Sequence, residues 1–307
     1  MAGEAPLMAD EPPARRRGPR AATPAARSER GRERAARARR RTRRRPRSDL
    51  QRRVLAAIPA IALALFLVLE GGLVFTIGLF VLGAICMHEL YAMYRRANPV
   101  RLAGFIALAG LLLAAQYGDQ FQVLLVAALA LPMLFGLTLL SPQPSVGGMA
   151  LTLLGIYWIG FAFAHAVLLR GLPHGEAIVI DVLVGTFLAD TGAYLGGRMF
   201  GKRPLAPRIS PNKTVEGLLI GMLFAILGVW IAGRYQEWLP GTHALVIGAA
   251  VAVAGPIGDL FESFVKRDAQ VKDSGGVFGA HGGALDRLDA VLFTAVAGYY
   301  VWAAYVH

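Results

Sequence analysis

Nine long apolar runs follow one another through most of this chain, and they limit what it can fold into. A helix needs about 20 apolar residues to cross roughly 30 Å of hydrocarbon. A hydrophobic content of 55% and a mean hydropathy of +0.50 also fit a membrane protein. We therefore predict an all-α polytopic membrane protein with about nine transmembrane helices. The runs are Val54–Leu69, Leu73–Tyr94, Leu102–Tyr117, Phe121–Leu140, Met149–Leu169, Ala177–Phe200, Val215–Ala232, Ala244–Val265 and Leu288–Val306, of which the first and third are short.

The basic charge is confined to the N-terminal tail. Residues 1–53 hold 18 Arg against 6 Asp or Glu, which accounts for the whole formal net charge of +12. A segment rich in Arg, Ala and Pro cannot bury a core, so we predict a disordered cytoplasmic tail that lies against anionic headgroups. The alternatives are a transit peptide, which the interspersed acidic residues disfavour, and nucleic-acid binding, for which no aromatic residues are interleaved with the Arg residues.

Basic residues also predict the orientation of the helices. With the tail inside, Lys and Arg crowd the inner connections and are sparse in the outer ones, as the positive-inside rule expects. We predict a multi-pass protein of the plasma (bacterial inner) membrane with a cytoplasmic N-terminus. The regions are a tail at 1–53, N-terminal transmembrane helices at 54–170 and a C-terminal catalytic region at 171–307.

The run 244–265 carries ionisable residues that a membrane helix normally excludes. Each costs at least about 2.5–3.5 kcal/mol on insertion scales, so each needs a partner or a function. Asp259, Glu262, Ser263 and Lys266 share one side of the predicted helix, opposite an apolar back. Two interpretations are open: a structural Glu262–Lys266 ion pair, or a polar seam that lines a cytoplasm-facing cavity in the C-terminal half.

The sixth run and the loop after it repeat this pattern. Asp190 lies inside the run, and Arg208 and Lys213 follow in the basic loop, where they suit phosphate. Part of the loop is ordinary helix-start chemistry, because Ser210 or Asn212 can cap the helix that begins near residue 215.

The stretch 266–289 holds the densest cluster of charge and glycine in the chain. Glycines let backbone amides approach an oxyanion closely. Asp286 and Asp289 are three apart at a helix start and can face the same point, with Arg287 and His281 close by in the sequence. Acidic residues together with Asp259 suit hard divalent cations, and Lys266, Arg267 and Lys272 suit phosphates. The mixture predicts metal-assisted phosphoryl or nucleotidyl transfer.

Two further polar residues lie within apolar runs. Glu89 is deep enough in the second run to be functional, as a partner for a Lys or Arg of another helix. His165 is more typical of a satisfied interhelical hydrogen bond. Cys86 is the only cysteine, so no disulfide framework or cysteine-based metal site is expected.

Residues 263–289, SFVKRDAQVKDSGGVFGAHGGALDRLD, resemble the signature of the phosphatidate cytidylyltransferases, the CDP-diacylglycerol synthases. Two further stretches, DTGAYLGGRMFGKRP and ISPNKTVEG within 190–217, also resemble motifs of that family. The matching positions of the signature are Ser263, Lys266, Arg267, Lys272, Asp273, His281, Gly282, Gly283, Asp286, Arg287 and Asp289.

The resemblance implies transfer of CMP from CTP to phosphatidic acid, giving CDP-diacylglycerol and pyrophosphate. It implies a Mg²⁺ centre held by Asp259 and Asp286, with a second metal ion left open, and a homodimer among membrane lipids. Catalytic roles are expected for Asp259, Lys266, Asp286, Arg287 and Asp289. Substrate contacts are expected for Asp190, Arg208, Ser210, Lys213, Ser263, Arg267, Lys272, Asp273, His281, Gly282 and Gly283.

Two rival functions remain at the level of sequence. A CTP-dependent polyprenol or lipid kinase would use similar groups, and an ion-coupled transporter would also carry intramembrane Asp259, Lys266 and Asp190. A transporter usually shows repeat symmetry, whereas these charges gather in the last third of the chain. Assay of CTP with phosphatidate separates the three.

Overall fold

A computed structural model describes residues 48–275 and 282–306, with side chains from residue 59 onward. The chain divides into two units, Met1–Ala56 and Ala57–His307, and the second contains all the described helices except the start of α2 (Ser48–Glu70). His281 and residues 1–47 of the predicted tail lie outside the described residues, whereas residues 48–53, predicted as disordered, belong to the helix α2. All nine apolar runs are helical, which confirms the all-α membrane fold.

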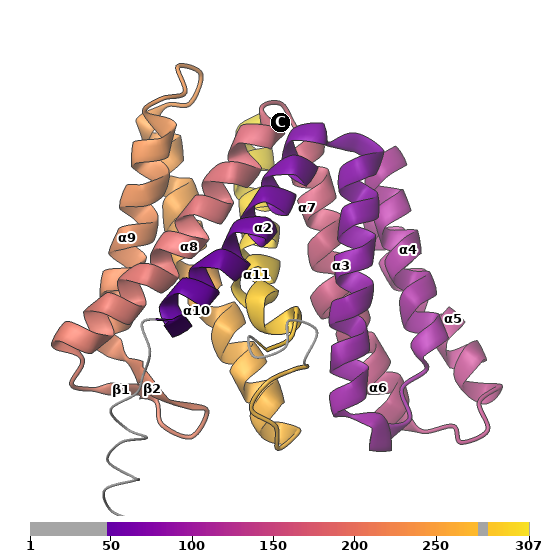
Figure 1. Cartoon of the computed structure of the whole chain (residues 1–307). Coiled ribbons are helices and arrows are strands. Elements are labelled where there is room, and N and C mark those ends of the chain that lie inside the picture. Colours follow the sequence, from indigo (N-terminus) through magenta and orange to yellow (C-terminus); the bar gives the residue numbers. More distant parts are fainter. Residues whose placement is uncertain (1–47, 276–281, 307) are drawn as a thin grey trace, which may run out of the picture. The chain divides into compact units, whose positions relative to one another are not determined.

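Successive spans alternate in direction along the chain (Figure 1). Among the described residues, seven spans are long and apolar enough to cross a membrane, whereas α4 (Arg101–Tyr117) and the apolar part of α2, Pro59–Glu70, are shorter; the count of nine crossings stays a prediction. The α6 and α7 helices join through a π-helical turn, Ile156–Gly160, into one span. The helices are α2 (Ser48–Glu70), α3 (Gly72–Met93), α4 (Arg101–Tyr117), α5 (Gln120–Leu139), α6 (Val146–Gly155), α7 (Phe161–Gly171), α8 (Gly175–Phe200), α9 (Val215–Gly233), α10 (Gly241–Asp268) and α11 (Leu285–Val306).

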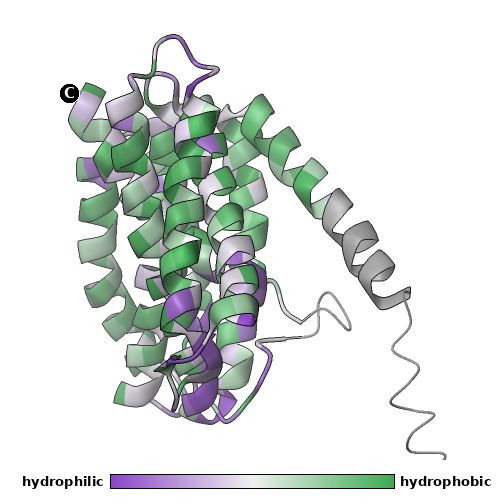
Figure 2. Ribbon diagram, turned by 90° about the vertical axis from the view of Figure 1, so that its left-hand side faces the viewer, coloured by the Kyte–Doolittle hydropathy of each residue, from purple (hydrophilic) through white to green (hydrophobic). Residues whose placement is uncertain are grey.

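Hydrophobic residues cover the middle of the helices, and hydrophilic ones gather toward their ends, with a large group at the lower end in Figure 2. At that end, the strands β1 (Pro204–Ala206) and β2 (Ser210–Thr214) form a short antiparallel hairpin between α8 and α9. The Arg267 guanidinium of α10 donates a 3.2 Å hydrogen bond to the carbonyl of Ile209 in the hairpin turn. The hairpin and the end of α10 are therefore neighbours.

Tyr94, just after α3, ties the first half of the chain to the same end. Its hydroxyl lies 2.9 Å from the carbonyl of Val265 and 2.8 Å from a carboxylate oxygen of Asp268. Burial and the hydrogen bond with Asp268 raise the pKa of the Tyr94 phenol above its ordinary value. The end of α3 thus packs against the end of α10.

Small residues bring α8 and α9 close together. A methyl group at Gly217 would overlap the carbonyl oxygen of Ala193, and one at Gly221 would overlap that of Ala189. Within a bilayer the hydrophobic effect does not drive helices together, because lipid tails are as apolar as the side chains. Membrane helices instead gain van der Waals energy where small residues let their backbones approach closely. This packing holds Asp190 on α8 near the hairpin that precedes α9.

Candidate metal and phosphate site

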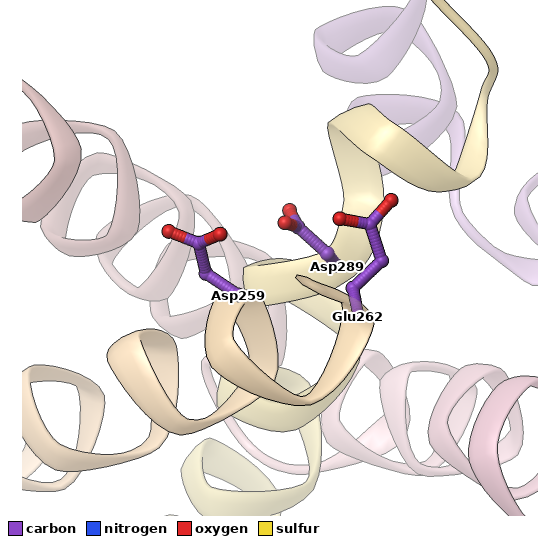
Figure 3. Close-up of side chains that lie close together, drawn as sticks. All are labelled: Asp259, Glu262 and Asp289. Carbon is purple, nitrogen blue, oxygen red and sulfur yellow. The ribbon is translucent and has the colours of Figure 1, made fainter. Parts of the chain in front are cut away.

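Three carboxylates from two helices converge at the lower end of α10 and α11. Asp259 and Glu262 project from α10, and Asp289 projects from α11 into the same space (Figure 3). One oxygen from each lies within 4.8 Å of the others. Asp259 and Glu262 share a face because three residues are nearly one helical turn. We call these three residues the carboxylate trio.

The close approach of α10 and α11 depends on Gly258. A methyl group at this position would overlap the carbonyl oxygen of Asp289 and press on the ring of Phe293. One turn earlier, a methyl group at Gly255 would meet only the side chain of Thr294, at an ordinary 3.6 Å. The glycine next to Asp259 therefore lets the two halves of the trio meet.

One member of the trio is buried, the other two are partly exposed, and two lysines face the trio. Glu262 is only 1% exposed, and its Oε1 atom receives no hydrogen bond within the described part of the chain. Lys213 of β2 forms an ion pair with Asp259, and Lys266 lies 2.5 Å from Glu262. Opposite charges at this range offset the cost of burying carboxylates. The predicted Glu262–Lys266 pair exists, and it belongs to a polar cluster that also includes Lys213, Asp259, Asp286 and Asp289. The interpretation that the seam lines a cytoplasm-facing cavity stays a prediction.

Asp286 has a different environment from the trio. Lys266 donates to it at 2.7 Å, and the backbone amides of Ser274 and Gly283 donate at 3.0 and 2.7 Å. Asp286 thus connects the segment before α11 to the end of α10 through hydrogen bonds. Of the two predicted metal ligands, Asp259 belongs to the trio and Asp286 adjoins it through Lys266; the metal role of Asp286 stays a prediction.

The hairpin brings only some of the predicted phosphate-binding residues to the trio. Lys213 reaches Asp259, whereas Arg208 is exposed in the turn between the strands. The predicted cap of α9 by Ser210 or Asn212 is wrong, because both lie in β2 and the Thr214 hydroxyl accepts from the amide of Gly217 instead.

The remaining predicted residues differ in burial. Asp190 lies within electrostatic range of Asp259, Lys213 and Asp289. Ser263 is half-buried on α10 beside Glu262. Gly282 adopts a left-handed φ of 84°, which favours glycine, and Gly283 is buried. The exposed residues are Arg267, Lys272, Asp273 and Arg287.

Glu89 is the residue whose surroundings the sequence did not predict. Its carboxylate accepts hydrogen bonds from the Ser274 hydroxyl and from the amides of Ala284 and Leu285, which are the partners that the described residues provide in place of the predicted Lys or Arg. An acidic residue inside an apolar run was the only signal in the sequence. His165 is satisfied as predicted, because its ring nitrogens lie 2.8 Å from the carbonyl of Phe161 and 3.3 Å from the hydroxyl of Tyr300.

Comparison with known proteins gives consistent matches. The model of the cytidylyltransferase family matches residues 51–305. A phosphatidate cytidylyltransferase of Bacillus subtilis is 36% identical over 270 residues, which cover 84% of this chain and 99% of that protein. Proteins of the same name from Staphylococcus saprophyticus and Staphylococcus aureus are 31% and 35% identical, each covering 78% of this chain and 94% of the relative.

Proposed function

This chain belongs to the cytidylyltransferase family, and we propose that it transfers CMP from CTP to phosphatidate, giving CDP-diacylglycerol and pyrophosphate. The observation that carries this proposal is the carboxylate trio with Lys213 and Lys266 against it. Carboxylates that suit a metal, beside cations that suit phosphate, match what nucleotidyl transfer between two anionic substrates requires. The names of the relatives supply the lipid substrate.

The donor set fits a hard divalent cation such as Mg²⁺. All three members of the trio offer oxygen, and the Oε1 atom of Glu262 is a buried acceptor that receives no hydrogen bond from the described residues. Asp259, Glu262 and Asp289 would hold the ion, with Asp286 as the alternative partner of Asp259. When bound, the metal would screen the charge of the phosphates and of the pyrophosphate that leaves.

The lysines supply the positive charge that the protein itself contributes. In the reaction, a phosphate oxygen of phosphatidate forms a bond to the α-phosphorus of CTP, and the bond from that phosphorus to pyrophosphate breaks. Phosphatidate is already anionic near neutral pH, so its attacking oxygen needs little deprotonation. Lys213 and Lys266 now neutralise carboxylates of the cluster and lie where incoming phosphates would meet them. We assign them the task of bringing two anions together.

The position of the cluster also supports the choice of substrates. It lies near the end of α10 and the beginning of α11, next to the polar hairpin, so a lipid can approach along the helices and a nucleotide from water. We propose that this end faces the cytoplasm of a cell with the enzyme in its plasma membrane, and that the N-terminus is on the same side. Basic residues in the segments after α3 and α8 support that orientation. A homodimer is part of the same proposal.

The decisive experiment is turnover by the purified protein in detergent with Mg²⁺ and radiolabelled CTP. CTP labelled in the cytidine ring should give labelled CDP-diacylglycerol with phosphatidate, and CTP labelled in the γ-phosphate should give labelled pyrophosphate. Asp259→Asn is the inactive control. Transfer of the γ-label to polyprenol or diacylglycerol would instead identify a kinase, and no consumption of CTP with any lipid would contradict the proposal.

A further inference from the structure

We propose that Glu89, on α3, is a positioning residue that holds the start of α11 so that Asp289 meets Asp259 and Glu262. This inference rests on the proposed function. It assigns to a helix of the N-terminal half a role in the metal site, although none of its side chains belongs to the trio.

Glu89 acts as a cap supplied from another helix. Its side chain is 3% exposed, and its two oxygens accept from the amide of Ala284 at 3.1 Å and from that of Leu285 at 3.0 Å. The first amides of a helix have no acceptor within the helix, and a negative charge there also interacts favourably with the helix dipole. Glu89 therefore satisfies the beginning of α11.

The same carboxylate is connected to the site through Ser274. The Ser274 hydroxyl lies 3.1 Å from Glu89, and the Ser274 amide donates to Asp286 at 3.0 Å. Asp286 in turn accepts from Lys266, which pairs with Glu262 of the trio. Asp286 and Asp289 lie on consecutive positions of one helix face, so a shift of the start of α11 would move both.

The segment before α11 is built closely around Glu89. The three atoms nearest to a methyl group at Gly275 would all belong to the Glu89 side chain. A methyl group at Gly283 would overlap both Glu89 and the Ser274 hydroxyl. The carboxylate of Glu89 therefore fits only because Gly275 and Gly283 have no side chains, and substitution of either glycine tests this contact.

The first test replaces the carboxylate with an amide of the same size. In Glu89→Gln one terminal oxygen becomes an NH₂ group, which cannot accept from a backbone amide. The matched control is Asp181→Asn: Asp181 is likewise buried, at 1% exposure, accepts a 2.9 Å hydrogen bond from Gln236, and lies in the first half of α8, away from the hairpin. Loss of a group that orients metal ligands typically costs 10–100-fold in metal affinity or activity, so we expect the half-activating Mg²⁺ concentration to rise about tenfold or more.

A second readout needs no turnover. Addition of Mg²⁺ alone should raise the melting temperature of the purified wild-type protein, and Glu89→Gln should require about tenfold more Mg²⁺ for the same rise. The control should keep the wild-type Mg²⁺ midpoint. A variant that melts lower without Mg²⁺ yet keeps the wild-type midpoint and Mg²⁺ activation would overturn the proposal, because Glu89 would then only stabilise the fold.

A pair of substitutions tests the geometry directly. Gly275→Ala should impair Mg²⁺ activation because its methyl group overlaps Glu89. The shorter side chain of Glu89→Asp withdraws from that space, so the double variant should recover activity relative to Gly275→Ala. If the activity loss of the double variant equalled the product of the losses in Gly275→Ala and Glu89→Asp, the proposed contact would be contradicted. If the wild type made no CDP-diacylglycerol, the proposed function would fail, whereas the Mg²⁺ melting shift would still test the role of Glu89.

Discussion

The ammonium group of Lys266 lies 2.7 Å from a carboxylate oxygen of Asp286 and 2.5 Å from one of Glu262. One cation on α10 therefore joins a carboxylate of the trio to the residue that fastens the start of α11. All three side chains are at most 15% exposed. Removal of one partner from such a cluster leaves a buried charge unpaired. The free-energy cost of the removal therefore exceeds the net contribution of the intact ion pair to stability.

Lys266→Ala should raise the KM for CTP and lower kcat. The lost cation contributes to phosphate binding, and Glu262 and Asp286 would repel each other and any anionic substrate. We expect kcat/KM to fall by at least about 100-fold, which corresponds to roughly 2.7 kcal/mol. Arg234→Ala, at the far end of α9, should keep wild-type kinetics; unchanged KM and kcat in Lys266→Ala would contradict the assignment.

Glu262→Gln and Asp286→Asn distinguish the two proposed sets of metal ligands. If the trio holds the metal, Glu262→Gln should weaken Mg²⁺ activation at least as much as Asp259→Asn, and Asp286→Asn should weaken it less. If Asp259 and Asp286 hold the metal instead, Asp286→Asn should weaken Mg²⁺ activation more than Glu262→Gln does. Activity measured against Mg²⁺ concentration for each purified variant decides between them. Wild-type activation in Asp259→Asn would exclude both sets.

Gly258→Ala should separate α10 from α11. Its methyl group has to displace the backbone at Asp289, and overpacking of this kind typically destabilises by about 1–3 kcal/mol. Because the displaced backbone carries Asp289, activity should fall together with the melting temperature. Gly255→Ala, on the same helix, meets only an ordinary contact with Thr294 and should change neither quantity. Equal behaviour of the two variants would mean that this close approach does not matter.

Cysteine labelling tests the orientation. The native Cys86 is fully buried, so it should not react. In intact cells, an impermeant maleimide should label Glu237→Cys in the exposed loop between α9 and α10, and it should spare Pro207→Cys in the hairpin turn. Permeabilised cells should label both, which controls for reactivity. The opposite pattern would separate the cluster from cytosolic CTP.

Deletion of residues 2–45 should leave turnover in detergent within about tenfold of the wild type, a change of at most roughly 1.4 kcal/mol in the barrier. The reason is that all the residues assigned to the site lie between positions 89 and 289, outside the tail. A larger loss in a truncated protein that still melts cooperatively would make the tail part of the site.

The helical membrane fold could be predicted from the sequence because hydrocarbon imposes a length and a composition on any segment that crosses it. The same principle identified the polar residues. Asp259, Glu262 and Lys266 share a helix face by spacing alone, and charges inside an apolar run require partners. The cap of α9 was predicted less well from local sequence: Ser210 and Asn212 were the predicted caps, whereas Thr214 caps the helix. The reason is that Ser210 and Asn212 belong to strand β2 of the hairpin, so the helix begins only after Thr214.

The sequence by itself determined which residues are ionisable within the membrane and which helix face each occupies, because helical period and hydropathy are local properties. Only the tertiary structure decided their partners. Gly258 sets the distance between α10 and α11, and with it the meeting of Asp259 with Asp289. Glu89 lies in a helix nearly 200 positions earlier, yet it binds the start of α11. Contacts between distant segments depend on how closely backbones pack, and no local pattern of residues encodes that distance.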